Sequence, residues 1–224
     1  MKVTPHFFLL FISLISVSCY PSSIGKYPIG SREKVAKESA INTLYTFPLH
    51  QADSITVRLR IDSTRISAMQ VSTGQTIDLS DTYRPVEVFK LEAIDLNFDG
   101  YNDLRILNNE GDTGNSWYDT WIYNHKTKTF VKNQFLSQST SLMVDTLSRK
   151  ILTYYRAGAC EESLGVYAVK DTTYTLVEDW ASESRNEQCI IFRLRIKNKQ
   201  VLGKDSTLSN QGLLATYKRS ALPK

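Results

Sequence analysis

The sequence predicts an all-β protein, either an antiparallel β-sandwich or a barrel-like single domain, and two patterns support this. Apolar and polar side chains alternate at every second position from Ser54 to Ile61 and again from Phe192 to Lys197. Such a period of two is typical of a strand with one buried face. No long segment has the apolar spacing of a helix.

Further strands are expected between these two segments, around residues 66–71, 86–95, 103–108, 117–124, 151–156, 164–169, 173–179 and 188–197. Short polar stretches join several of them, at residues 124–126, 170–171 and 197–199. Short strands linked by short turns favour an antiparallel sandwich or barrel.

The amino-acid composition and net charge limit the classes of function that the chain can have. The chain has 224 residues, 42% of them hydrophobic, which is enough to bury a core and excludes general disorder. The 27 Lys and Arg residues exceed the 23 Asp and Glu residues by a formal charge of +4. That excess is too small to indicate a nucleic-acid partner.

The first 18 residues have the features of a signal peptide. Lys2 carries the only charge, and an apolar run extends from Phe7 to Val17, interrupted by two serines. The run is shorter than the roughly 20 residues of a membrane-spanning helix but fits a signal-peptide core. The small residues Ser16 and Ser18 then precede Cys19.

This ending resembles a bacterial lipoprotein signal, which implies that Cys19 becomes a lipid-modified first residue. Ser16 stands where such signals prefer Leu, and an ordinary secretory signal cleaved near Ser18 is the alternative. Both interpretations place the mature chain outside the cytoplasm. The lipoprotein interpretation anchors it to the membrane without a span. Tyr20 is not an acidic retention signal, which favours the outer membrane, on its periplasmic side or at the cell surface.

Three segments are therefore expected, namely a signal peptide (1–18), a tether (19–45) and a β-rich calcium-binding domain (46–224). The tether is predicted from the Pro, Gly and Ser residues that follow Cys19. Lys34 to Leu44 forms either a short helix or more of the tether.

One acidic loop predicts a calcium site. Asp95, Asn97, Asp99 and Asp103 occupy positions 1, 3, 5 and 9, with Gly100 at position 6. Calcium takes about six to eight oxygen ligands, and a glycine permits the sharp turn that gathers them. The backbone carbonyl of Tyr101 is the fifth expected ligand. The alternative is a solvated acidic turn without metal.

The flanks of this loop indicate its type. An EF-hand places Glu at position 12, whereas Ile106 stands here, and the neighbouring segments are predicted strands. The expected arrangement is a strand–loop–strand calcium site. The motif occurs once, so the chain is not a propeller, which would repeat it in every blade.

The block from Val86 to Leu136 combines IDLNFDGYNDL, a Gly/Asn-rich turn, WYDTWIYN and KTKTFV. It resembles a family of calcium-loop bacterial lipoproteins related to periplasmic lysozyme inhibitors, some of them immunity proteins against peptidoglycan-degrading toxins. Cys160 also matches a cysteine that members often have after a YYR-x-G segment. The resemblance implies extracytoplasmic calcium binding and inhibition of a peptidoglycan hydrolase.

The resemblance also implies a partner-binding loop, because family inhibitors insert a loop with small and tyrosine residues into the hydrolase cleft. In this sequence the loop is Gly111–Tyr118, and the expected contacts are Gly114, Asn115, Ser116 and Tyr118. The alternative is a hairpin connection whose Trp117 and Tyr118 belong to the core or to an aromatic surface strip.

Cys160 and Cys189 are left once Cys19 is assigned to lipid. Outside the cytoplasm they are expected to form a disulfide. A Cys160 nucleophile with His50 or His125 is the rival interpretation, but neither histidine has a catalytic context, and no His/Cys spacing supports zinc.

An enzyme is not expected, because no nucleophile elbow, phosphate loop or metalloprotease motif occurs. Adjacent Glu161 and Glu162 would point to opposite faces of a strand and so make poor acid–base partners.

Charge is unevenly distributed along the chain. Residues 185–224 hold nine basic and two acidic side chains, whereas residues 19–184 hold seventeen and twenty-one. The basic end could contact anionic headgroups or cell wall, or could be a solvated sheet face. The acidic body would attract a basic hydrolase.

Three functions remain in view. A lipid-anchored inhibitor of a peptidoglycan hydrolase is preferred. The alternatives are a calcium-dependent module that binds cell-surface glycan or protein without inhibition, and a hydrolase with an unrecognised carboxylate pair.

Overall fold

The computed structural model describes residues 31–34, 43–62, 65–79, 90–186, 188–209 and 212–221. Fifteen strands and two short helices lie in these residues, and every strand pairs antiparallel with its neighbours in its own sheet. The predicted all-β fold is therefore confirmed.

The strands form three sheets, each a simple meander. The first sheet contains β1 (Ser31–Lys34), β2 (Thr43–His50), β3 (Asp53–Asp62), β4 (Arg65–Val71) and β5 (Thr76–Asp78). The second contains β6 (Leu91–Ile94), β7 (Asp103–Glu110), β8 (Ser116–Asn124) and β9 (Thr129–Lys132). The third contains β10 (Met143–Asp145), β11 (Lys150–Arg156), β12 (Glu162–Lys170), β13 (Thr173–Arg185), β14 (Gln188–Lys197) and β15 (Gln200–Ser209).

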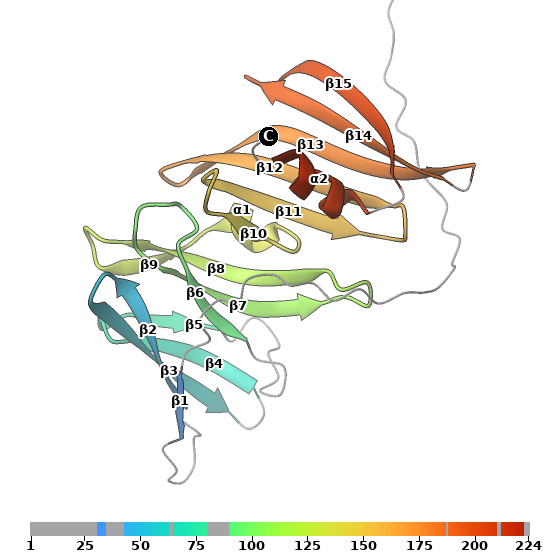
Figure 1. Ribbon diagram of the computed structural model, residues 1–224. Helices are drawn as coiled ribbons and strands as arrows, with labels where there is room; N and C mark the ends of the chain where they lie inside the picture. Colours follow the sequence, from blue (N-terminus) through green and yellow to red (C-terminus); the bar gives the residue numbers. More distant parts are fainter. Residues whose placement is uncertain are drawn as a thin grey trace, which may run out of the picture.

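The three sheets are stacked, with the second sheet between the other two (Figure 1). Helix α1 (Gln134–Gln138) lies between the second and third sheets, and α2 (Leu213–Ala221) covers the outer side of the third. Asn133 caps α1 by accepting a hydrogen bond from the backbone N–H of Leu136 at 3.0 Å.

Three apolar cores hold the stack together. The largest fills the space between the first two sheets with eighteen buried residues, among them Phe47, Met69 and Leu104. A second lies between the second and third sheets, around Leu136 of α1. The third, centred on Leu164, is shared by the outer face of the third sheet and α2.

The alternation from Ser54 to Ile61 marks a buried strand face as expected, because the four apolar residues Ile55, Val57, Leu59 and Ile61 are at most 4% exposed. The alternation in β14 has another outcome. Phe192, which belongs to the apolar set there, is only half-buried. Ile191 on the opposite face is 1% exposed and packs in the core with α2. The predicted alternation in β14 is present, but the buried face is the one that carries Ile191, not the one that carries Phe192.

Part of the predicted tether belongs to the first sheet, because β1 and the beginning of β2 lie within residues 19–45. Lys34 and Leu44, the ends of the segment left open between helix and tether, are both in strands. The signal peptide and Cys19 lie outside the described residues. Within those residues, no helix has the length and apolar character needed to cross a membrane.

Candidate functional site

The acidic loop connects β6 to β7, so its strand–loop–strand setting is confirmed. Two residues take the left-handed backbone conformation that closes the turn, Phe98 with φ of 61° and Gly100 with φ of 91°. Glycine adopts this conformation without strain, which explains its place at position 6. The chain therefore folds back within nine residues and gathers the acidic side chains.

Side chains of the loop accept hydrogen bonds from its own backbone. The carboxylate of Asp95 accepts from the N–H groups of Asp99 at 3.2 Å and Gly100 at 2.9 Å. Asp99 accepts from the N–H of Tyr101 and from the amide of Asn97, both at 2.9 Å. These bonds fix the loop with its carboxylates turned inward.

Asp103 is fully buried and serves as a connector. Its two oxygens accept hydrogen bonds from the backbone N–H groups of Leu96 at 2.7 Å and Tyr123 at 2.8 Å. Burial raises its pKa well above the usual value, and the charges of Asp95 and Asp99 raise it further, against the lowering effect of the two N–H groups. Asp103 thus joins the loop to β8, a role that spacing did not predict.

The loop also contacts the sheets on both sides of the second one. Gly100 accepts a hydrogen bond from Nδ1 of His50 at 2.7 Å, and the backbone N–H of Asn102 donates to Leu49 at 2.8 Å. Arg149, in the turn between β10 and β11, donates to the carbonyl of Phe98 at 2.5 Å. The acidic loop therefore links all three sheets.

The donor set suits a hard cation, since Asp95, Asn97, Asp99 and the carbonyl of Tyr101 offer only oxygen atoms. Among the described residues, no group of three or more His, Cys, Asp or Glu side chains is arranged to hold a metal. Asp103 is directed to backbone amides. Each carboxylate oxygen still has a lone pair beyond the N–H that it accepts. Calcium binding stays a prediction.

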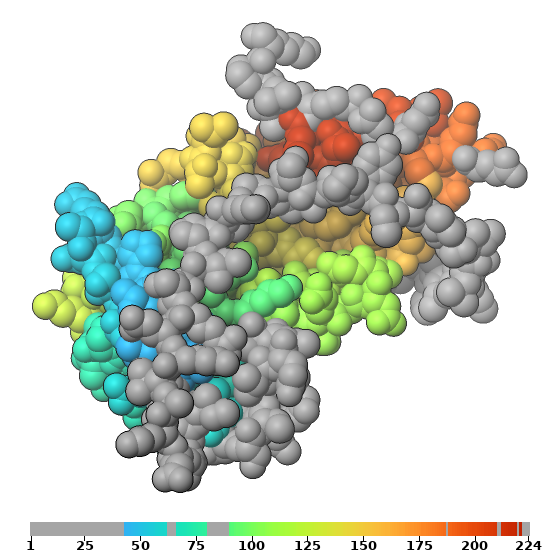
Figure 2. Space-filling model, turned by 60° about the horizontal axis from the view of Figure 1, so that its bottom comes forward, coloured from blue at the N-terminus to red at the C-terminus, as the bar shows by residue number. Residues whose placement is uncertain are grey.

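The predicted partner-binding loop is pinned at its base and exposed at its tip. Asn115, 3% exposed, donates to the carbonyl of Arg156 at 2.8 Å and accepts from its N–H at 2.9 Å. Asp112, Thr113 and Gly114 are exposed, with Gly114 in the left-handed region at φ of 80°. In Figure 2 this green hairpin lies at the surface beside the gold segment that contains Arg156.

Tyr118, predicted to contact the partner, is 9% exposed and faces inward. The guanidinium of Arg105 lies 4.4 Å from the centre of its ring, a cation–π contact, and Arg105 is itself paired with Glu92 at 2.6 Å. Asn115 and Tyr118 are therefore buried and support the loop. Gly114 and the half-buried Ser116 stay on the accessible side.

The predicted disulfide between Cys160 and Cys189 is present, with Cα atoms 5.4 Å apart. It ties the connection between β11 and β12 to the beginning of β14. A disulfide-bonded Cys160 is no nucleophile. His50 and His125 both contact the ring of Tyr101, at centroid distances of 4.3 and 5.3 Å, so they belong to the acidic loop.

Glu162 is a buried carboxylate whose role the sequence did not reveal. It accepts hydrogen bonds from the hydroxyl of Tyr154 at 2.5 Å and from the N–H of Leu213, the first residue of α2, at 2.6 Å. Burial and the bond to Glu162 both raise the pKa of Tyr154. Glu161 lies in the connection just before β12 and is exposed, whereas Glu162 is buried.

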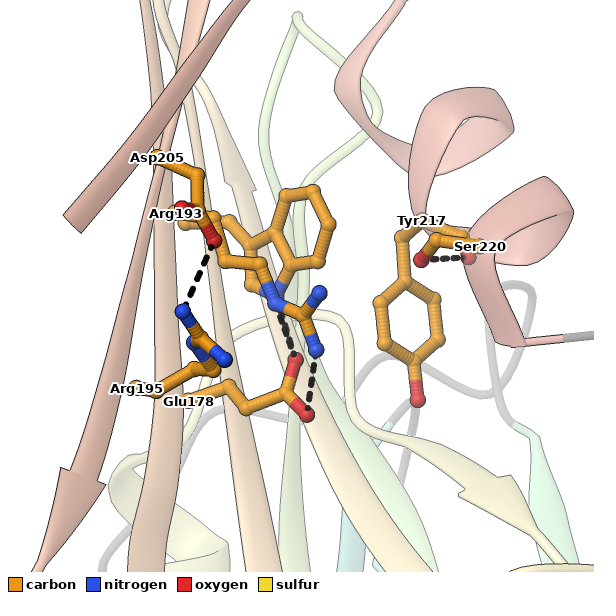
Figure 3. Close-up of polar contacts among 7 residues, drawn as sticks. Glu178, Arg193, Arg195, Asp205, Tyr217 and Ser220 are labelled. Atoms are coloured by element: carbon orange, nitrogen blue, oxygen red, sulfur yellow. Dashed lines mark hydrogen bonds and ion pairs between the residues drawn. The ribbon is translucent and has the colours of Figure 1, made fainter. Parts of the chain in front are cut away.

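Ion pairs offset part of the basic C-terminal charge (Figure 3). Arg193 forms an ion pair with Glu178 at 3.1 Å and lies over the ring of Trp180. Arg195 pairs with Asp205 at 3.4 Å. The basic C-terminal segment is therefore, in part, a sheet face whose arginines form ion pairs with acidic side chains. This arrangement agrees with the interpretation of the segment as a solvated sheet face.

Comparisons with known proteins bear on the fold. A scan against models of protein families finds no match for this chain, and a search of curated proteins finds none either. The chain is similar to the solved structure of a Xanthomonas protein related to a type IV secretion system, with a TM-score of 0.51. The two are 16% identical, and the match covers 81% of this chain and 100% of the other. At this identity the likeness shows the fold alone.

Proposed function

We propose that the chain is a lipid-anchored extracytoplasmic protein that binds a peptidoglycan hydrolase and occludes its active site. The exposed tip of the β7–β8 hairpin, formed by Asp112, Thr113 and Gly114 above the buried Asn115, carries this proposal. A narrow loop on a fixed base can enter a cleft at little cost in conformational entropy.

Two further features support this function. The signal-like N-terminus ending at Cys19 directs the chain out of the cytoplasm, where such a hydrolase acts. Asp112 adds a negative charge at the tip, which would attract a basic hydrolase.

Calcium has a structural part in this proposal. Asp95, Asn97, Asp99 and the carbonyl of Tyr101 would hold the ion, and its charge would offset the repulsion among the carboxylates of the loop. Because the loop links all three sheets, the ion would fix the sheets relative to one another. It takes no part in any reaction.

The test is a cell-wall lysis assay with hydrolases of several classes, each mixed with the soluble chain from residue 20. At least one class should be inhibited and bound. Replacing Thr113 with Arg should weaken both, because a long charged side chain at the tip would meet the cleft wall. Thr172→Arg is the matched control, since Thr172 is also exposed but lies in the turn between β12 and β13.

Two results would sink the proposal. One is the absence of any inhibited or bound hydrolase class at micromolar protein. The other is equal inhibition by the wild type and the Thr113→Arg variant, which would place the contact elsewhere on the surface.

A further inference from the structure

A cavity of about 350 Å³ lies between α1 and the face of β11 and β12 that does not contact α2. The α1 side contributes Phe135, Gln138, Ser139 and Thr140, and the sheet contributes Thr153, Tyr154, Tyr155, Ser163 and Tyr167. This volume is at the lower end of the range for small-molecule sites, about 300–1,000 Å³.

The lining is aromatic and neutral. It contains the aromatic rings of Phe135, Tyr155 and Tyr167 and five hydroxyl or amide side chains, and none of its residues is charged at neutral pH. The ring of Tyr154 lies on the other face, where its hydroxyl donates to Glu162. Among the described residues, the side chains of Gln138, Thr140, Thr153 and Ser163 make no hydrogen bond. Their donors and acceptors are therefore available to a ligand in the cavity.

The wall of the cavity is built around Gly165. A Cβ atom there would lie 2.8 Å from Cε2 of Tyr167 and 2.9 Å from Oγ1 of Thr153, closer than atoms approach. Glycine within a strand often marks a place where another group comes close to the backbone. Its absent side chain lets the Tyr167 ring lie across the strand.

The aromatic wall is held before any ligand arrives. The ring of Tyr167 meets that of Phe135 edge-on at a centroid distance of 4.9 Å, and Phe135 stacks on Tyr174 at 5.1 Å. Rings fixed in this way lose little conformational freedom on binding.

We propose that this cavity binds a neutral saccharide of one or two rings. A sugar ring has an apolar C–H face that packs on aromatic rings and hydroxyl groups that need neutral donors and acceptors. A charged ligand would be buried without a counter-charge, which is costly. Asp179 stands opposite Gly165 in the register of β12 and β13 and would repel an anionic sugar.

This inference is independent of hydrolase inhibition, because the lining includes no residue of the loop Asp112–Ser116. The two proposals can therefore fail separately. The Thr113→Arg variant tests inhibition, and changes in the cavity test saccharide binding.

The experiment titrates the soluble chain with disaccharides of N-acetylglucosamine, glucose, galactose and mannose, with digalacturonic acid as the charged comparator. Binding is followed by calorimetry and by chemical-shift changes. At least one neutral sugar should bind, and the acid should not. The double variant Thr153→Val, Ser163→Ala removes two hydroxyls with almost no change in shape and should weaken binding about tenfold or more.

Thr175→Val with Ser184→Ala is the matched control, because both residues are exposed on β13 and outside the cavity lining. Its affinity should equal that of the wild type. Thermal unfolding of each variant shows that it is folded before its affinity is compared. The proposal is overturned if no neutral sugar binds at millimolar concentration, if the acid binds best, or if both double variants lose affinity equally.

Discussion

The first two sheets enclose eighteen buried hydrophobic residues, whereas the third sheet shares seven with α2. The third sheet is also stabilised by contacts of other kinds. These are the disulfide between Cys160 and Cys189, the hydrogen bonds of the buried Glu162, and the ion pair between Glu178 and Arg193. Its last strand, β15, is exposed along nearly its whole length.

This difference shows two ways of stabilising a β-sheet. Burial of apolar area does not depend on direction and scales with the amount buried, so the first pair of sheets is held together mainly by its core. A sheet with a small core depends on a few directed bonds. Substitutions should therefore act through lost volume in the first region and through lost partners in the second.

Phe47→Ala should have the largest effect. Phe47 is 1% exposed in the core between the first two sheets, and truncating such a residue costs about 3–5 kcal/mol. Denaturant unfolding would measure this cost. Phe192→Ala, at the half-buried apolar face of β14, is the matched control and should cost clearly less. Equal costs would mean that the core of the first region is not the stronger one.

Removing the disulfide should have the next largest effect, in the third sheet. The double variant Cys160→Ser, Cys189→Ser opens a connection between residues 29 apart in the sequence and should cost about 3 kcal/mol of unfolding free energy. A reductant should lower the stability of the wild type by the same amount and leave the double variant unchanged. Reductant sensitivity of the double variant would contradict this assignment.

Chelation tests the loop that links the two regions. If calcium is held by Asp95 and Asp99, free calcium at 100 times its dissociation constant adds about 2.7 kcal/mol to the stability. A chelator should then lower the melting temperature of the wild type but not that of the Asp95→Ala, Asp99→Ala variant. An unchanged wild-type melting temperature would show that the loop is stabilised by its hydrogen bonds alone.

Glu162→Gln should cost about 1–3 kcal/mol, because the amide nitrogen cannot accept one of the two hydrogen bonds that the carboxylate accepts from Tyr154 and Leu213. Glu161→Gln, one position away and exposed, is the control and should stay within about 0.5 kcal/mol of the wild type. Similar losses of unfolding free energy in both variants would show that Glu162 does not stabilise the third sheet.

The sequence was informative where one face of a strand is buried, as from Ser54 to Ile61. It was not informative for β15, where both faces are exposed and no apolar period develops. In β2, the exposed Pro48 and the half-buried Leu44 and Tyr45 hide the pattern. Short helices such as α1, with five residues, are below the length at which periodicity is visible.

The residues of the candidate sites were predictable from the sequence, but the orientation of their side chains was not. Spacing identified the acidic loop, yet it could not show that Asp103 turns toward the N–H groups of Leu96 and Tyr123. The family resemblance suggested Tyr118 as a contact, whereas packing under Arg105 buries it. The cavity beside α1 arises from strand register, which brings together residues that are not periodic in sequence.

Asp179→Asn should have the smallest effect, about 0.5 kcal/mol or less. Burial raises the pKa of Asp179 above its usual value, against a backbone hydrogen bond from Trp180 that lowers it. The folded chain therefore binds a proton more readily than the unfolded chain, and the ionised carboxylate at neutral pH destabilises the fold. The amide variant should be slightly more stable at pH 7.

That advantage should disappear as the pH falls through the folded pKa of Asp179 toward the unfolded value, because the wild-type carboxyl then becomes neutral as well. Denaturant midpoints of both proteins between pH 7 and pH 3 would measure the difference. Asp171→Asn, in an exposed turn of the same sheet, controls for the loss of one negative charge. If Asp179→Asn destabilises the chain at pH 7 more than at pH 3, Asp179 instead belongs with Glu162 among the carboxylates that stabilise the third sheet.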